Sequence, residues 1–530
     1  MTGPAGTGAL VRLALRRDRV LLLVWIAVFA AIAAVSAKAT VGLYTTEQAR
    51  VQAAEMFNHT KSLTALYGKV YDPTSAGALA MVKLGGSGAV MVAVLAILLV
   101  VRHTRAEEET GRLELVAATV VGRHAPLTAA IIIALVANVA LGVCTAAALV
   151  GAGLPADGSL VFGLSWASVG IAFAAIAAIT TQVSSRARAA RGFAIAVLGV
   201  VYVLRAVGDT ASESGPRWVG WLSPIGWGQQ FRPYAGNRWW VVLITTGFAA
   251  VAVAAAYLLA ARRDLGAGLV REHPGPATGP RLRGPLSLAW RLQRGSLLAW
   301  ASGFALLGAV FGNIASSVGD FFDSPAARDM VMALGGEKGL TDAFLATELG
   351  LVALIAAAYG ITSAMRLRAE ETASRAEPVL AAAVGRTRWA LSHLVVALGG
   401  TTVLMVVLGL SVGFAHGARV GDLGQVGRVL GGALAQLPAI WVLVGVVVAG
   451  FGLLPRISAL GWVVLVAVVV LSDLGPLLEL DQWVMGLSPF THLPKLPGSD
   501  WTLTPLLGLS AIAALMNAAG LAGFRRRDLG

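Results

Sequence analysis

The sequence reads RAEEETGRLELVAATVVGR from Arg105 to Arg123, and RAEETASRAEPVLAAAVGR from Arg368 to Arg386. The two stretches align without a gap, and eleven of their nineteen positions are identical. Roughly two identities are expected by chance in a chain this rich in alanine, so the agreement indicates an internal duplication. Both stretches are polar, whereas most of the chain around them is apolar.

Other parts of the two copies also match. RRDRVLLLVW (16–25) corresponds to RLQRGSLLAW (291–300), and WLSPIGWGQQF (221–231) corresponds to GLSPFTHLPKLP (486–497). Each copy ends on the word RRDLG, at 262–266 and at 526–530. A proline-rich stretch separates the copies. The sequence therefore predicts a first domain at 1–266, a linker at 267–285 and a second domain at 286–530.

The composition indicates an integral membrane protein. Hydrophobic residues make up 57% of the chain, charged residues make up only 13%, and the mean hydropathy is +0.76. Apolar stretches of roughly 20 residues, long enough to cross a bilayer as helices and too long for barrel strands, recur along the chain. Twelve such spans are predicted to begin near Val20, Lys83, Ala125, Leu160, Gly192, Trp239, Ser296, Ala346, Trp389, Leu430, Ala459 and Thr502.

We therefore predict an all-α polytopic membrane protein with about twelve transmembrane helices. Six helices per copy make the two copies parallel repeats, which are expected to be related by a pseudo-two-fold axis along the membrane normal. A central cavity could then draw its wall from both copies.

The net charge of +13 is explained by the predicted membrane topology and does not indicate that the protein binds nucleic acid. Most lysines and arginines fall in segments that are cytoplasmic if the N-terminus is inside, while the remaining segments carry more acidic than basic residues. Both termini are then cytoplasmic. The first apolar run could pass for a cleaved signal peptide, but its counterpart around Trp300 is internal, so both runs are expected to be retained spans.

The repeated polar segment is expected to be helical. On one continuous helix Glu107, Gly111 and Glu114 share a face, and Glu108 pairs with Arg112 at the favourable i,i+4 spacing. Two interpretations remain open. The segment is either a solvated connector between two spans or a surface, presented twice, for a two-fold partner.

The pattern E-E-x-x-G-x-x-E-L followed by V-G-R, directly after a second span, resembles the permeases of type-2 ABC exporters. The LSP word before the last span resembles the external segment of the same class, and the double-length form with RRDLG ends resembles actinobacterial exporters of polyketide antibiotics such as tetronasin. In that family the polar segment is the coupling helix that binds the ATPase subunit. The resemblance assigns this role to Glu107, Glu108, Gly111, Arg112, Glu114 and Arg123 in the first copy, and to Glu370, Glu371, Arg375, Glu377 and Arg386 in the second.

The second copy departs from this pattern at two positions, where Ser374 replaces the glycine and Pro378 follows the glutamate. The two segments are therefore not expected to couple equally. The chain has no phosphate-binding G-x-x-x-x-G-K-[ST] motif, because Gly68-Lys69 is followed by Val70. ATP and Mg²⁺ are accordingly expected in a separate cytoplasmic ATPase, two copies of which would bind this chain. The chain itself is not expected to be an enzyme.

Candidate substrate-pathway residues are few. Charges near the outer ends of spans and aromatic side chains inside them are candidates, with ordinary packing or hydration as the alternative. The sequence contains neither an HExxH motif nor a Cys/His cluster, so it predicts no metal site. The pathway candidates are Trp25, Trp300, Tyr202, Phe304, Arg205 and Asp473.

The resemblance implies a bacterial plasma-membrane exporter of a hydrophobic or amphipathic small molecule. One alternative is a proton-driven twelve-helix exporter, which needs a protonatable group within the membrane. Carboxylates are nearly absent from the predicted spans, and Glu348 is expected near an external end. A second alternative is a membrane scaffold that transports nothing.

Overall fold

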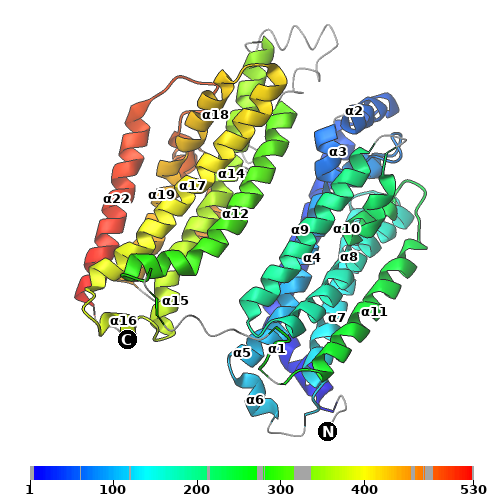
Figure 1. The fold of residues 1–530 in the computed structure, drawn as a ribbon. Coiled ribbons are helices and arrows are strands. Elements are labelled where there is room, and N and C mark those ends of the chain that lie inside the picture. Colours follow the sequence, from blue (N-terminus) through cyan, green and yellow to red (C-terminus); the bar gives the residue numbers. More distant parts are fainter. Residues whose placement is uncertain are drawn as a thin grey trace. The chain divides into compact units, whose positions relative to one another are not determined.

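The computed structural model describes residues 5–59, 61–117, 121–211, 215–264, 266–270, 278–279, 281–315, 336–454, 460–469, 471 and 481–527. Over these residues every regular element is helical, which confirms the all-α polytopic prediction. The chain divides into two compact units, Met1–Gly275 and Pro276–Gly530, and Figure 1 shows each as a bundle of long helices. The division falls inside the predicted linker.

Unit 1 is built on six helices that are long and apolar enough to cross a membrane. Shorter helices connect them at both ends of the bundle. The six long helices are α1 (Thr7–Leu43), α4 (Ala76–His103), α7 (Ala125–Gly151), α8 (Ala156–Val183), α9 (Ala187–Thr210) and α11 (Val241–Ala261). The connecting helices are α2 (Glu47–His59), α3 (Lys61–Tyr67), α5 (Arg105–Glu109), α6 (Arg112–Ala117), η1 (Arg217–Leu222) and α10 (Pro224–Gln230).

Unit 2 is also built on long helices joined by shorter ones in the part of the chain that is described. Its long helices are α12 (Pro285–Ala315), α14 (Gly336–Ala364), α17 (Arg386–Val420), the pair α18 (Gly424–Leu434) and α19 (Leu437–Leu453), and α22 (Leu503–Arg526). Its shorter helices are α15 (Arg366–Thr372), α16 (Glu377–Leu380), α20 (Leu460–Val469), α21 (Gln482–Met485) and η5 (Pro489–His492).

Eleven of the twelve predicted spans are present in the described residues as helices of sufficient length and apolarity. The span expected near Ala459 is described only as the ten-residue apolar helix α20, and the residues on either side of α20 lie outside the description.

The core of unit 1 forms around α8, which packs against α4, α7, α9, α10 and α11. Phe162, Trp166 and Phe173 of α8 are fully buried. Helices α7 and α8 approach closely because glycines face each other: a Cβ on Gly142 would lie 2.6 Å from the Gly163 carbonyl oxygen. Small residues of this kind allow dense packing where no hydrophobic effect drives helices together in lipid.

The repeated LSP word forms a helix start in both units. Ser223 and Ser488 are N-caps whose hydroxyls accept from the backbone N–H groups of Gly226 and Phe490, and a proline follows each serine at the first helical position. Trp227 within α10 is buried, and its indole donates to the Trp221 carbonyl at 2.6 Å.

Candidate functional site

The polar segment of unit 1 is not one helix. It consists of the short helices α5 and α6 joined at Gly111, whose φ of 71° is left-handed. The Gly111 N–H donates to the Glu108 carbonyl at 3.0 Å and closes the turn. This turn interrupts the helical periodicity, so the predicted common face of Glu107, Gly111 and Glu114 does not exist. The sequence signal for the turn was the glycine itself, which favours positive φ.

The second copy has the same turn despite its different residues. Ser374 replaces the glycine and adopts φ 52°, and its N–H donates to the Glu371 carbonyl at 2.9 Å. Pro378 occupies the first turn of α16, where its missing N–H leaves no partner unsatisfied. After this turn the two backbones differ, because α6 begins at Arg112 whereas α16 begins only at Glu377, two positions later in the alignment.

In unit 1, Glu108 is enclosed by two arginines. Its carboxylate lies 2.7 Å from Arg105 of α5 and 2.7 Å from Arg263, which follows the end of α11. The Arg263 contact is bidentate. The side chain of Glu108 is 7% exposed and that of Arg105 is fully buried. The predicted pairing of Glu108 with Arg112 is therefore wrong, because tertiary partners from the RRDLG word replace the local one.

Additional hydrogen bonds hold this ion triad. Arg105 Nε donates to the Thr181 carbonyl of α8 at 2.9 Å, and Arg105 Nη1 donates to the Ala267 carbonyl at 3.1 Å. Arg263 Nε donates to the side-chain oxygen of Gln182 at 2.7 Å. A buried ion pair is stabilising only when its remaining donors are satisfied, and here they are largely satisfied.

Unit 2 contains the equivalent triad. Glu371 lies 3.1 Å from Arg368 and 2.8 Å from Arg527, the second arginine of the terminal RRDLG word. Its enclosure is weaker, since the Arg368 side chain is 29% exposed and Glu371 Oε1 has no hydrogen-bond partner among the described residues. Arg527 lies over the rings of Phe451 and Phe524.

The arginine that ends each polar segment also binds the last span. Arg123 donates to the carbonyls of Ala260 and Arg263 at the end of α11, and Arg386 donates to the Arg527 carbonyl at 2.7 Å. Cations are favourable at helix C-termini, where carbonyl groups lack intrahelical partners. We call the triad together with this arginine the latch of each unit. The sequence showed RRDLG as a repeated word, but its contacts with the polar segment were not predicted.

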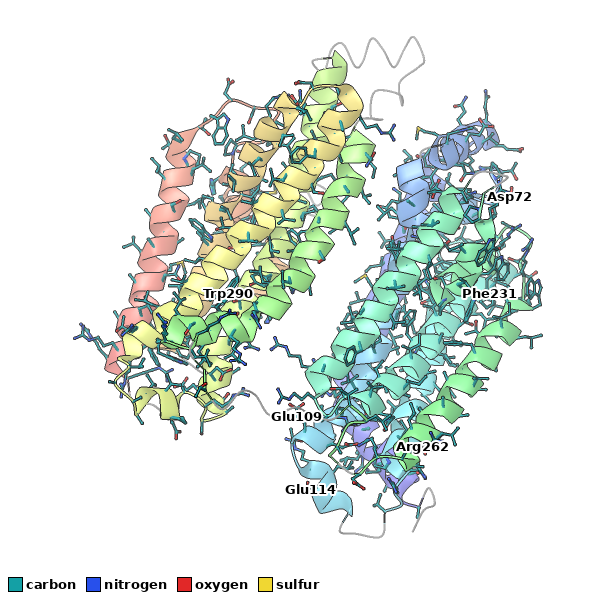
Figure 2. The ribbon with its side chains drawn as sticks, in the orientation of Figure 1. Asp72, Glu109, Glu114, Phe231, Arg262 and Trp290 are labelled. Carbon is teal, nitrogen blue, oxygen red and sulfur yellow. The ribbon has the colours of Figure 1, made fainter. Side chains whose placement is uncertain are left out.

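The remaining predicted residues lie on the outside of the segments. Arg112, Glu114, Arg375 and Glu377 are exposed, and Glu107 and Glu370 are partly exposed. Figure 2 shows Glu109, Glu114 and Arg262 at one end of unit 1, and Asp72 and Phe231 at the opposite end. The predicted coupling residues thus divide into an internal latch and an exposed surface that a partner could contact.

A buried carboxylate near the latch was missed. Asp18 of α1 has no exposed surface, and it lies 2.8 Å from Arg102 and 2.6 Å from His103 at the end of α4. In the second copy, Gln293 occupies the position of Asp18 and accepts from the Ser363 hydroxyl. The isolated acid within the basic run RRDR was the available signal in the sequence.

The predicted aromatic pathway residues pack within their own units. Trp25 stacks on Phe29 with ring centroids 5.4 Å apart, and Phe304 lies 6.3 Å from Trp300. Trp300 also contacts Tyr359 edge-on at 6.0 Å. These contacts favour the packing alternative, and a role in the substrate pathway stays a prediction.

Arg205 is fully buried and bound within unit 1. Its guanidinium donates to the carbonyls of Ala65 and Leu66, at the end of α3, and lies 3.3 Å from Asp209. It also lies over the ring of Tyr202, whose hydroxyl donates to the same Leu66 carbonyl. These contacts account for a buried charge without a substrate. Asp473 lies outside the described residues.

Glu348 lies within α14, and its position near an external end of the span stays a prediction. Its Oε2 is buried and has no hydrogen-bond partner among the described residues. Among all the residues that the structure describes, no group of three or more His, Cys, Asp or Glu side chains could hold a metal ion.

Comparison with known proteins assigns the chain to a family. The family described as "Multidrug efflux system permease Rv1217c, C-terminal domain" matches residues 8–259 and 282–525. The chain is also 44% identical over 532 aligned positions to the multidrug efflux system permease protein Rv1217c of Mycobacterium tuberculosis (strain ATCC 25618 / H37Rv), covering 100% of this chain and 96% of that protein. With its polytopic helical fold and two matched stretches, the chain belongs to this family of multidrug efflux system permeases.

Proposed function

We propose that this chain is the membrane permease of an ATP-driven efflux pump of the ABC type. It moves a hydrophobic or amphipathic small molecule out of a bacterial cell by alternating access between the two sides of the plasma membrane. Its relative's name supports the permease and the multidrug character. The resemblance of both polar segments to coupling helices supports the ATP-driven mechanism.

The repeated latch is the observation that carries the proposal. In each unit a short exposed helix pair is bound through a buried glutamate to the arginine that follows the last span. A partner that displaces the exposed residues also displaces the end of α11 or α22, because the buried contacts are costly to break. The latch therefore offers a mechanical connection from the partner to the membrane helices.

Two exposed segments with the same left-handed turn and the same buried ion pair support two bound copies of one ATPase. This chain contributes no nucleotide site, since its sequence lacks the phosphate-binding loop. ATP and Mg²⁺ then bind only to the partner. The bilayer and the exported molecule are the remaining ligands.

The contacts at one end of unit 1 support a cytoplasmic N-terminus. The Gly122 N–H donates to the Ala5 carbonyl at 2.9 Å, and Arg123 binds the end of α11. The start of α1, the polar segment and the end of α11 thus lie at the same end of the unit. If the segment meets a cytoplasmic ATPase, all three are cytoplasmic.

A double charge reversal tests the proposal. Glu114→Arg with Glu377→Arg alters the exposed surface and leaves both latches intact. We expect the double variant to lose the co-purifying ATPase and to lose ATP-dependent efflux of a fluorescent drug from inverted vesicles. Glu55→Arg, an equal change on the exposed face of α2 at the other end of unit 1, is the matched control. Normal ATPase binding and efflux in the double variant would contradict the proposal.

A proton-driven exporter is the second candidate, and Glu348 is the observation that favours it. A buried carboxylate without a hydrogen-bond partner inside a membrane helix is the kind of group that proton transport requires. Efflux that stops with an uncoupler while ATP is held constant would support this candidate against the first. A scaffold that transports nothing would show no efflux, with ATP or with a proton gradient.

A further inference from the structure

A small cavity lies at the end of unit 1 opposite to the polar segment. Its walls come from the residues that follow α3, from α4 and α8, and from the end of α10 and the residues after it. Figure 2 labels Asp72 and Phe231, which are sequence neighbours of two lining residues, at this end of the unit. The volume is about 40 Å³, and one water needs at least about 10–15 Å³. The cavity therefore has room for a compact ion and not for a drug.

Two cations and no acidic side chain line the cavity. Lys69 has no hydrogen bond or ion pair with any residue that the structure describes, and Asp209, whose charge acts on Lys69, is held by Arg205 at 3.3 Å. Arg232 lies over the ring of Tyr71, and its Nε is buried without a partner among the described residues. Burial lowers the pKa of the Arg232 guanidinium, because the charged form has lost water. A bound anion would compensate both charges.

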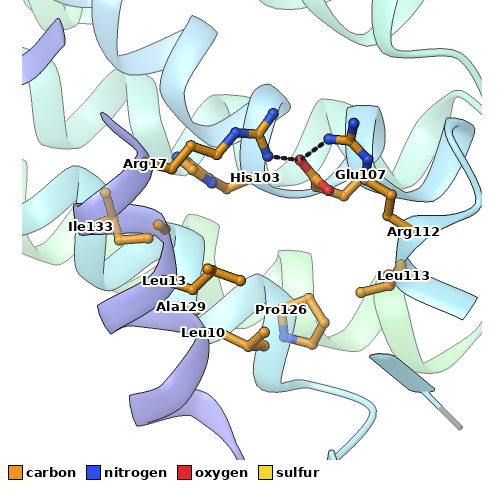
Figure 3. A pocket seen from close by; sticks show the side chains of 11 residues that line it. Leu10, Leu13, Arg17, His103, Glu107, Arg112, Leu113, Pro126, Ala129 and Ile133 are labelled. Atoms are coloured by element: carbon orange, nitrogen blue, oxygen red, sulfur yellow. Dashed lines mark hydrogen bonds and ion pairs between the residues drawn. The ribbon is translucent and has the colours of Figure 1, made fainter. Parts of the chain in front are cut away.

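This cavity differs from the charged groove beside the latch of unit 1. In that groove Arg17 and Arg112 both face Glu107, and Figure 3 shows the carboxylate between the two guanidinium groups. The protein itself thus supplies the anion there. Around Lys69 and Arg232 no described carboxylate takes this place. The missing negative charge must come from solution.

Tyr71 supplies a neutral hydrogen-bond donor to the cavity. Burial raises the pKa of Tyr71 to about 12, and the negative charge of Asp209 is a smaller cause in the same direction. The phenol therefore keeps its proton at neutral pH. Its oxygen accepts from the Gln230 amide at 3.1 Å, which leaves the O–H free to donate to an anion.

Gln229 supplies an acceptor, and this group narrows the class of anion. Its side chain is 8% exposed, and its Nε2 donates to the Tyr67 carbonyl at 3.0 Å, which identifies the other amide atom as the oxygen. That oxygen, Oε1, is buried and has no hydrogen-bond partner among the described residues. An unpaired buried acceptor is costly. A bare anion would repel it, whereas an anion with an O–H group can donate to it.

We propose that this cavity binds one compact oxyanion that carries its own O–H group, such as hydrogen phosphate or hydrogencarbonate. Lys69 and Arg232 hold the charge, because ammonium and guanidinium groups are the usual partners of such oxyanions. Tyr71 donates to one oxygen of the ion, and the O–H of the ion donates to Gln229. Sulfate and nitrate match these ions in shape but carry no proton at neutral pH, so Gln229 discriminates against them. This binding requires neither the ATPase nor the exported molecule.

Only the first copy has these residues. In the aligned stretch of the second copy, Pro494 stands at the position of Gln229 and Pro497 at the position of Arg232. A proline side chain carries no charge and accepts no hydrogen bond. We therefore expect one such ion for each chain.

Ion binding to the detergent-purified full chain tests the site. The unfolding midpoint, followed by tryptophan fluorescence, is measured against ion concentration at constant ionic strength and pH 7. Phosphate is compared with sulfate, and hydrogencarbonate with nitrate. We expect saturable stabilisation by phosphate or hydrogencarbonate, and none by the matched ion without a proton. Arg232→Gln should weaken this binding at least about ten-fold, the loss expected for one charged hydrogen bond. Lys38→Gln, which removes an exposed charge near the same end of α1, should leave it unchanged.

Two variants of Gln229 separate a specific site from a general effect on stability. Gln229→Leu removes the acceptor and should make sulfate bind about as well as phosphate. Gln229→Glu places a carboxylate in the cavity and should abolish the binding of all four ions. Equal stabilisation of the wild type by all four ions would indicate a general salt effect and overturn the proposal. The absence of saturable stabilisation by both proton-bearing ions would also overturn it, as would unchanged discrimination against sulfate in Gln229→Leu.

Discussion

The two polar segments share a left-handed turn and differ in their chemistry. Gly111 and Ser374 make the same left-handed turn, and Glu108 and Glu371 bind equivalent arginines. The first triad is almost fully buried and its carboxylate is bonded through both oxygens, whereas the second has a partly exposed Arg368 and a Glu371 oxygen with no hydrogen-bond partner among the described residues. The comparison shows that the left-handed turn accepts serine in place of glycine, and that both turns lie beside a buried glutamate bound to arginine.

The largest expected effect follows from removing the first glutamate. Glu108→Gln leaves Arg105 and Arg263 buried without a counter-charge and should destabilise the protein by about 3 kcal/mol. Glu371→Gln should cost only about 1 kcal/mol, because its arginines reach water. Thermal unfolding in detergent, followed by tryptophan fluorescence, compares the two variants. An equal or larger loss in Glu371→Gln would show that exposure does not distinguish the latches.

The next effect concerns the buried acid near the first latch. Asp18→Gln introduces the side chain of the second copy and should destabilise the protein by about 2 kcal/mol, since Arg102 and His103 lose their carboxylate. Adding Val100→Ser, which supplies the equivalent of Ser363, should recover part of the loss. The same unfolding measurement applies. If Val100→Ser destabilised the wild type and the Asp18→Gln variant equally, the Asp18 site could not be replaced by the Gln293–Ser363 pair of the second copy.

A smaller effect is expected at the turn. Ser374→Gly removes a non-glycine residue from the left-handed region and should stabilise unit 2 by about 1 kcal/mol, while Gly111→Ser should destabilise unit 1 by a similar amount. Unfolding midpoints in urea or heat provide the check. Opposite signs for the two substitutions support the shared turn, and equal signs contradict it.

The smallest effect is expected at the membrane carboxylate. Glu348 corresponds to Gly85 in the first copy, and an ATP-driven mechanism does not require its proton. Glu348→Gln should leave drug efflux within about two-fold of the wild type in vesicles supplied with ATP, since no transport step titrates it. Complete loss of efflux with normal protein levels would favour the proton-driven candidate.

Particular residues show how far sequence reasoning reached. The repeat between Arg105 and Arg368 located both polar segments, and the positions of the apolar runs predicted the long helices. Assigning Glu108 to Arg112 failed because local spacing cannot compete with a buried bidentate partner 155 residues away in sequence. The role of Asp18 was missed for the same reason, since its partners lie on another helix.

By itself, the sequence determined that this protein is a helical membrane protein with a duplicated polar segment, because apolar length and internal identity are properties of the linear chain. Only the tertiary structure decided which charges are internal and which are available. It placed Glu108, Arg123 and their counterparts in latches and left Arg112 and Glu114 exposed. The physical reason is that a charge can be buried at low cost only if another group replaces the water around it. Packing of distant parts of the chain brings that group into place.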